Sequence, residues 1–202
     1  MSTEVCGTSR IVGCRFSLYP MSDRFVDIIL GAIQEADTSK VWTETGDVST
    51  CVRGRLEHVF DVMKAIYLHA AKTGEHVVFS GTFSIGCPGD SAGDVYMSED
   101  AVRMNEDIVS SIRIEGAAEY ALYALGEPEY MKKIANVVDI AKEDGSYGGG
   151  IHYATRLEGD VHTIFKTLEQ SFEVTQESVS HVVMTVTLSC NSPSNKKQGK
   201  AE

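Results

Sequence analysis

The sequence has little of the chemistry that marks metal sites, redox sites or membrane spans. Its five cysteines are scattered, and no two of them have the C-x-x-C spacing of zinc and redox sites. The odd count predicts reduced, mostly buried thiols in a cytoplasmic protein. No apolar run approaches the roughly 20 residues of a membrane span, and Met1 to Arg10 lack the apolar stretch of a secretory signal.

Positive charge is also scarce. The 202 residues include 18 Lys and Arg against 29 Asp and Glu, which gives a formal net charge of -11 at pH 7. An acidic surface repels phosphate backbones and anionic lipids, so we expect neither nucleic-acid binding nor membrane insertion. The six histidines show no metal-ligand spacing, so we expect no metal and no cofactor. Apolar residues make up 43% of the chain, which is enough for a packed core.

Motifs of catalysis and phosphate binding are missing. The segment Ser146-Tyr147-Gly148-Gly149-Gly150 resembles a phosphate-binding loop only loosely, because no Lys-Ser or Lys-Thr follows it. We interpret it as the turn of a β-hairpin. The acidic residues are spread out, and no nucleophile is paired with a base in the sequence pattern. The sequence therefore predicts a protein that is not an enzyme.

The chain does contain an internal repeat. His76-Val77-Val78 recurs 105 residues later as His181-Val182-Val183. At the same offset Thr50 aligns with Thr155, Phe60 with Phe165, and Thr82 with Thr187. With one residue of slippage, residues 15–19 align with 119–123. An offset that holds across several segments predicts two tandem copies of one domain.

Each copy shows the same pattern of helices and strands. Apolar residues at helical spacing predict amphipathic helices over 25–36 and 56–67, and again over 130–141 and 161–172. Alternating residues predict strands over 15–19, 40–44, 48–53 and 75–83. The order β-α-β-β-α-β is the ferredoxin-like motif, so the predicted fold class is α+β, with two tandem ferredoxin-like repeats.

The repeat sets the predicted domain boundaries. The first repeat covers residues 1–90 and the second covers 117–194, with a linker over 91–116 and a disordered tail over 195–202. The linker is expected to contain a helical turn around Val102 to Ile112. Helices can cover only one face of each predicted sheet. The uncovered faces and the edge strands favour a homodimer.

The uncovered faces are the first place to look for a ligand. Along the predicted last strands, hydroxyl side chains alternate with apolar ones, and threonines and tyrosines recur at equivalent positions of both copies. Hydroxyls can bond a small polar ring, and an aromatic side chain can stack on it. The candidate ligand-binding residues are Ser17, Tyr19, Ser49, Thr50, Ser80, Thr82, Tyr123, His152, Thr155 and Thr187. A solvated face, a polar interface between sheets, strand propensity for the threonines and edge packing for the tyrosines are the alternative interpretations.

Several long segments resemble the YkoF family, which comprises bacterial proteins that bind thiamin and its hydroxymethylpyrimidine (HMP) moiety. The resemblance covers nearly the whole chain, through residues 6–11 (CGTSRI), 15–21 (RFSLYPM), 37–42 (DTSKVW), 81–90 (GTFSIGCPGD) and 191–194 (NSPS). It implies a homodimer of tandem ACT-like, ferredoxin-like repeats with one ligand site in each. It further implies a role in vitamin salvage near a thiamin or HMP uptake transporter.

Three hypotheses for function follow. The first is a non-catalytic binding protein for thiamin and HMP. The second is a cofactor-free enzyme, since small dimeric ferredoxin-like proteins include oxygenases and isomerases, and the third is an ACT-like regulatory protein that senses amino acids. The missing acid-base pair disfavours the enzyme. The absence of an attached catalytic domain disfavours the regulatory appendage.

Overall fold

The helices and strands follow the predicted repeat. A computed structural model describes residues 11–86, 98 and 100–194. The first repeat consists of β1 (Val12–Pro20), α1 (Phe25–Glu35), β2 (Trp42–Thr45), β3 (Thr50–Gly54), α2 (Leu56–Ala71) and β4 (Val77–Ile85). The second consists of β5 (Glu115–Leu125), α4 (Tyr130–Glu143), β6 (Tyr147–Ile151), β7 (Ala154–Asp160), α5 (Val161–Gln176) and β8 (His181–Cys190). The β-α-β-β-α-β order of the ferredoxin-like repeat is thus confirmed in both copies.

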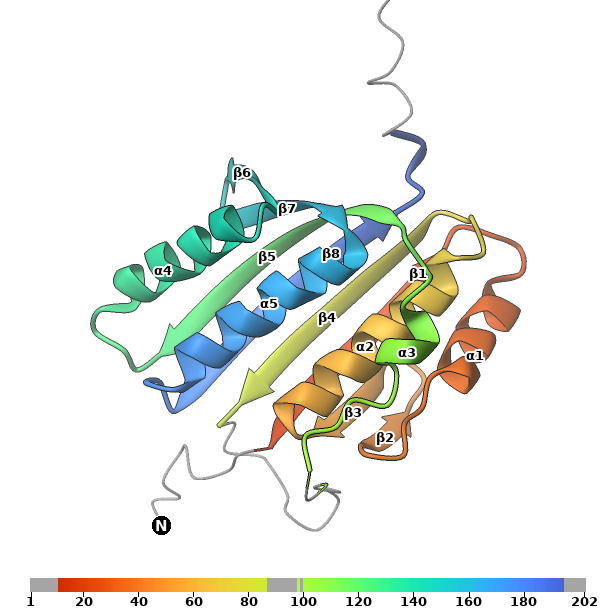
Figure 1. Cartoon of the computed structure of the whole chain (residues 1–202), viewed down its shortest axis with the longest axis horizontal. Helices are drawn as coiled ribbons and strands as arrows, with labels where there is room; N and C mark the ends of the chain where they lie inside the picture. Colours follow the sequence, from red (N-terminus) through yellow and green to blue (C-terminus); the bar gives the residue numbers. More distant parts are fainter. Residues whose placement is uncertain (1–10, 87–97, 99, 195–202) are drawn as a thin grey trace, which may run out of the picture.

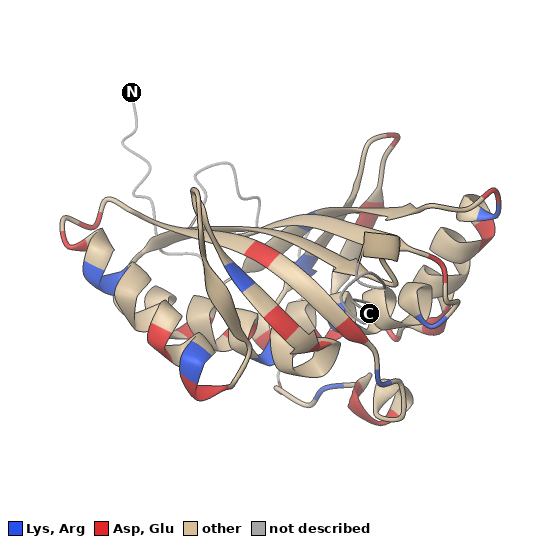
Figure 2. Cartoon of the chain, turned by 90° about the horizontal axis from the view of Figure 1, so that it is seen from above, with Lys and Arg blue, Asp and Glu red and all other residues tan. Residues whose placement is uncertain are grey.

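All eight strands form one antiparallel sheet, in the order β2-β3-β1-β4-β8-β5-β7-β6. The helices cover one face of this sheet, and none of the helices in the described residues lies on the other face (Figures 1 and 2). We call the first the helix face and the second the open face. Side chains alternate between the two faces along each strand, so β1 buries Phe16 and Leu18 on the helix face and leaves Arg15 and Tyr19 exposed.

The expectation of two separate sheets was wrong. Strand β4 pairs with β8 over their length, from Val77 opposite Cys190 to Ile85 opposite Val182. Each of these strands would otherwise present unpaired backbone N–H and C=O groups at a sheet edge, and each satisfies those of the other. The edges that remain belong to β2 and β6.

The predicted turn over 146–150 was also wrong, because Tyr147–Ile151 forms strand β6. This strand lies at the edge of the sheet and pairs with β7 alone, with a register shift between Tyr147 and Gly149. Glycine weakens a strand, but an edge strand with a bulge accommodates it, and Gly149 takes a φ of 117°. The turn itself is formed by His152 and Tyr153.

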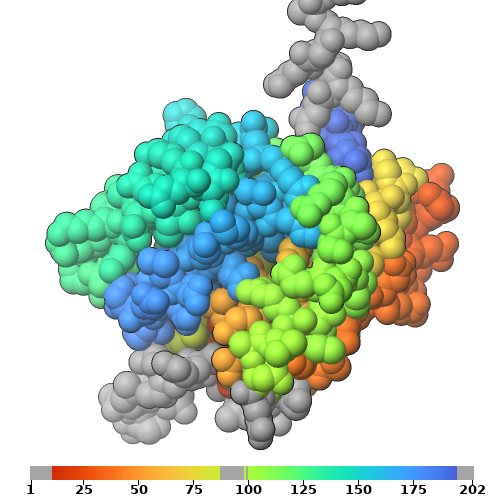
Figure 3. Space-filling model, viewed as in Figure 1, coloured from red at the N-terminus to blue at the C-terminus, as the bar shows by residue number. Residues whose placement is uncertain are grey.

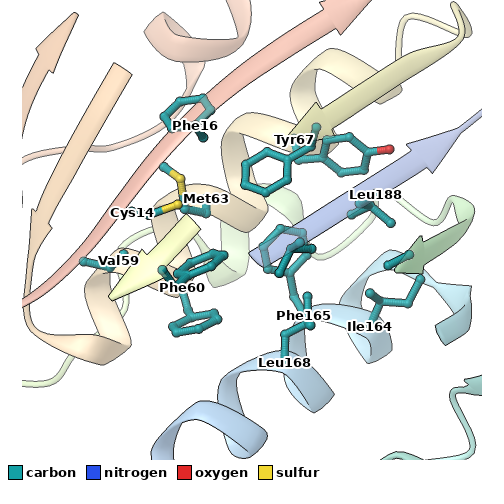
Figure 4. Packing of buried hydrophobic residues seen from close by; sticks show 14 of the residues in the cluster. Cys14, Phe16, Val59, Phe60, Met63, Tyr67, Ile164, Phe165, Leu168 and Leu188 are labelled. Atoms are coloured by element: carbon teal, nitrogen blue, oxygen red, sulfur yellow. The ribbon is translucent and has the colours of Figure 1, made fainter. Parts of the chain in front are cut away.

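The core lies between the sheet and helices α2 and α5. Phe60 of α2 stacks on Phe83 of β4 with ring centroids 4.4 Å apart, and Phe79 meets Phe165 of α5 at 6.4 Å (Figure 4). Because aromatic residues of both repeats contact each other here, the core is continuous across the repeat boundary.

The linker packs on the first repeat through helix α3 (Glu106–Val109) (Figure 3). The predicted helical turn in the linker is therefore confirmed. Asn105, which is fully buried, donates from its side chain to the carboxylate of Asp61 at 2.8 Å and to the carbonyl of Asp37 at 3.0 Å. It accepts from the backbone N–H of Asp37 at 2.8 Å. One amide thus ties the linker to two neighbouring segments.

The cysteines described form no disulfide, and Cys14 and Cys190 are buried while Cys51 is partly buried. Burial raises the pKa of the Cys190 thiol to about 11, so this thiol stays protonated at neutral pH. Cys6 and Cys87, residues 91–97 and 99 of the linker, and the predicted tail over 195–202 lie outside the described residues.

Candidate functional site

A cavity of about 490 Å³ lies in the second repeat, between helix α4, the end of strand β5 beyond its pairing with β7, and the β6–β7 hairpin. Strand β5 supplies Tyr120, Leu122 and Ala124 to its wall, and α4 supplies Tyr130, Ile134 and Val137. The hairpin of β6 and β7 closes the third side with Ile151, Tyr153, Ala154 and Thr155. The size and the mostly apolar lining, with a few hydroxyls, are typical of a small-molecule site.

Two hydroxyl-bearing residues face each other in this wall. Tyr120 on β5 pairs with Thr155 on β7, and both side chains project to the helix face. The Tyr120 hydroxyl donates to the carbonyl of Val137 at 3.4 Å, and burial raises the pKa of this phenol. Tyr120 therefore stays neutral at physiological pH and can act as a hydrogen-bonding group.

The first repeat has an equivalent arrangement at the other end of the shared sheet. Phe16 on β1 pairs with Thr50 on β3, in the positions of Tyr120 and Thr155. The Thr50 hydroxyl lies 3.0 Å from the hydroxyl of Thr45 on β2. The threonine is thus common to both repeats, whereas the aromatic partner carries a hydroxyl only in the second.

Exposed apolar residues gather around both positions. In the second repeat Tyr123, Leu125, Tyr130, Met131 and Tyr153 are each 46% exposed or more. Their counterparts in the first repeat are Tyr19, Met21, Phe25, Val26 and Val48, each 50% exposed or more. Exposed apolar clusters mark interaction sites, and here the cluster recurs with the repeat. The pattern indicates one site in each repeat.

The structure places the predicted site residues of the strands on both faces of the sheet, and Ser49 and His152 in the hairpin connections. Ser80 pairs with Ser17 on one side and with Thr187 on the other, and these three share the open face with Thr82. Two of the open-face hydroxyls near the first repeat's hairpin already have partners: Ser17 donates to the carbonyl of Val48 at 3.0 Å, and Ser49 accepts from Arg15 at 3.1 Å.

Thr50 and Thr155 lie on the helix face, so the sheet separates them from the open-face hydroxyls. The cavity is lined by Thr155 and by none of these open-face hydroxyls. Of the predicted residues, Thr155 and Tyr123 border the cavity. His152 is exposed in the turn between β6 and β7, and its ring lies 6.2 Å from that of Tyr153.

Sequence reasoning missed the cavity residues Tyr120, Tyr130, Ile134 and Tyr153. Tyr130 and Ile134 belong to the apolar stripe of a predicted helix, which was assigned wholly to the core. A stripe that begins with a tyrosine at the helix start, matched by Phe25 in the first repeat, could have indicated a site. Nothing in the periodicity marked Tyr153, because it lies in a turn.

The described residues hold no group of three or more His, Cys, Asp or Glu side chains that could bind a metal ion. Within the same part of the chain, none of the helices has the length and apolar character needed to cross a membrane. The positions of Lys, Arg, Asp and Glu are spread over the helices, strands and loops of the described chain (Figure 2).

Comparison with known proteins agrees with the internal repeat. The model of the YKOF-related family matches the chain twice, over residues 11–90 and 115–195. The chain is also 53% identical over 198 residues to a protein of Bacillus subtilis (strain 168) named "Putative HMP/thiamine-binding protein YkoF". The matched region covers 97% of this chain and 99% of the Bacillus protein.

Proposed function

Because the chain belongs to the YKOF-related family, we propose that it binds thiamine and HMP, at one site in each repeat. The cavity between α4, β5 and the β6–β7 hairpin is the observation that carries this proposal. The equivalent apolar cluster around Thr50 marks the second place where a ligand would bind.

The lining suits a flat heteroaromatic ring. Tyrosine side chains from three different elements can contact the faces and edges of an aminopyrimidine. The hydroxyls of Thr155 and Tyr120 can exchange hydrogen bonds with its ring nitrogens and exocyclic amine. Thiamine adds a cationic thiazolium ring, which aromatic faces attract and which the net charge of -11 tolerates.

We propose binding without catalysis. The cavity-lining residues of the described chain are Tyr, Ala, Leu, Ile, Val and Thr, and they include no Asp, Glu, His, Cys, Lys or Arg. General acid-base or nucleophilic chemistry on a pyrimidine would require at least one such group within reach of the ring. The cellular role that fits is salvage or uptake of the vitamin in the cytoplasm, in association with a thiamine or HMP transporter.

We also propose a homodimer. The open face presents a central row of exposed hydroxyls on β4 and β8, namely Ser80, Thr82, Thr185 and Thr187, and no helix from residues 11–86 or 100–194 lies over them. A second copy stacked on this face would cover it. Sedimentation equilibrium at micromolar concentration tests this directly, and a stable 22.0 kDa species would rule the dimer out.

Calorimetric titration with thiamine and with HMP tests the binding function. We expect two equivalents bound per chain, recovery of unchanged ligand after incubation, and no binding of amino acids. Thr155→Val should weaken binding at the second site, while the double variant Ser80→Ala/Thr187→Val should leave it intact. The reverse result would place the ligand on the open face, and no heat with either compound would overturn the proposal.

A further inference from the structure

Tyr153 lies at the rim of the cavity. Both the solvent exposure of its ring and its backbone conformation are unfavourable in the protein without a ligand. Its side chain borders the cavity, yet the residue is 98% exposed. A large aromatic ring that contacts little of its own protein loses the gain of apolar burial. Its described ring contact is with His152, at 6.2 Å between centroids.

The backbone of Tyr153 is also strained. Ile151 pairs with Ala154, so His152 and Tyr153 form a two-residue turn, and Tyr153 takes a φ of 68°. This left-handed conformation is disfavoured for a bulky side chain and is usually supplied by Gly or Asn. Strain that persists at a binding rim is a recognised sign of function.

We propose that Tyr153 is a ligand-contacting residue, which stacks its ring on the flat heteroaromatic ligand held in the second repeat's cavity. This inference rests on the proposed function, and it assigns a role to one side chain of that site. The exposure and the turn conformation place the ring at the cavity mouth, where a bound ring would supply the missing apolar contact. Stacking on tyrosine also favours a cationic ring such as a thiazolium.

The first repeat has no equivalent aromatic residue in its corresponding hairpin. Val48 occupies the equivalent position and is 81% exposed, but it has no aromatic ring and no left-handed backbone. Tyr153 therefore acts on the second site alone, and it makes that site more selective for flat aromatic ligands than the first.

Tyr153→Asn separates the two consequences of the proposal. Asparagine suits the left-handed turn, so the variant should melt at a higher temperature than the wild type. Loss of the stacked ring should weaken thiamine binding at the second site by about fivefold or more, with the first site unchanged. Tyr153→Phe should bind like the wild type. Val102→Asn, which alters an exposed apolar residue of the linker outside the cavity, serves as the surface control.

Calorimetry and thermal melting on the full chain give the decisive readings. If the wild type binds thiamine at two sites and Tyr153→Asn binds equally well at both, the stacking role is wrong while the proposed function stands. If the wild type binds neither thiamine nor HMP, both proposals fall. A variant that melts lower and binds more weakly would identify Tyr153 as a structural residue of the hairpin, which also overturns the role assigned to it.

Discussion

Gly81 and Val186 are 105 residues apart in the sequence, and they pair directly with each other across strands β4 and β8. Because 105 residues is also the offset of the repeat, Gly81 pairs with its own counterpart in the second repeat. The local twofold axis that relates the two repeats therefore passes between these two residues. The two repeats are joined by a continuous antiparallel ladder between β4 and β8, and we call this ladder the seam.

Gly81 is required at this seam because its neighbour fills the space of a side chain. A Cβ atom at position 81 would lie 2.5 Å from the ring of Phe79, which is itself buried against Tyr67 and Phe165. We expect Gly81→Ala to lower the free energy of unfolding by roughly 1–3 kcal/mol, because the ring has no room to move. Urea unfolding measures this change.

Gly31→Ala in helix α1 is the matched control, since nothing lies within 4 Å of a Cβ atom there. It should stabilise the protein by up to about 1 kcal/mol through helix propensity and chain entropy. Equal effects of the two substitutions would show that packing at the seam is not what requires glycine.

The linker depends on Asn105 in a comparable way. Asn105→Ala removes the amide that bonds Asp61 and Asp37, and it leaves buried partners unsatisfied. We expect a loss of about 2–3 kcal/mol in the free energy of unfolding. Hydrogen exchange should also rise in residues 104–112, because the linker loses its anchor.

Ser110→Ala, at an exposed position of the same linker, should change stability by less than about 0.5 kcal/mol. If Asn105→Ala also left the free energy of unfolding unchanged, the linker would be held by apolar contacts such as those of Val109 instead.

Much of the fold could be predicted from the sequence, because the spacing of apolar residues indicates the helices and strands of each repeat. The same pattern recurs in the second copy, which supports the assignment made for the first. The pairing of β4 with β8 could not, since backbone hydrogen bonds between distant strands leave no pattern in side chains. Less of the candidate site than of the fold could be predicted. Alternation does place Thr50 with Val52 and apart from Ser49, so the threonines could have been assigned to the helix face. The cavity itself depends on how far α4 stands from the sheet, which no single residue encodes.

A buried histidine predicts how stability depends on pH. Burial and the nearby Lys72 ammonium lower the pKa of His69, while Glu35, 2.9 Å from its Nδ1, opposes them. The folded protein therefore binds this proton less readily than the unfolded chain. The stabilisation is present above the unfolded pKa of about 6.5 and is lost as the pH falls below it.

We expect the wild type to lose stability between pH 7.5 and 5.5, and His69→Gln to lose less over the same interval. Urea unfolding at the two pH values measures the difference. His152→Gln, at an exposed turn, should follow the wild type. A steeper dependence in His69→Gln would mean that the charged imidazole stabilises the fold, contrary to the direction of its pKa.

The two proposed sites should differ in their affinity for thiamine. Both keep a threonine, but Tyr120 in the second repeat is replaced by Phe16 in the first. Thr50 has Thr45 as a hydroxyl partner at 3.0 Å, whereas the hydroxyl partner of Thr155 is Tyr120, which lines the same cavity. We expect the second site to bind thiamine more tightly, and Tyr120→Phe to weaken it by about 0.5–1.5 kcal/mol, or up to about tenfold.

Single substitutions of the threonines complete the test, because valine keeps their shape and removes only the hydroxyl. Thr155→Val should weaken the tighter site by about 1 kcal/mol and leave the other unchanged, and Thr50→Val should affect only the weaker site, by a smaller amount. Calorimetry of each variant at the same ligand concentrations resolves the two affinities. A wild-type titration that fits one class of identical sites, or a Tyr120→Phe variant with unaltered affinity, would show that this hydroxyl does not distinguish the repeats. If the two sites differ in affinity but Tyr120→Phe leaves both affinities unaltered, the difference between Tyr153 and Val48 at the two hairpins would be a remaining source of inequality.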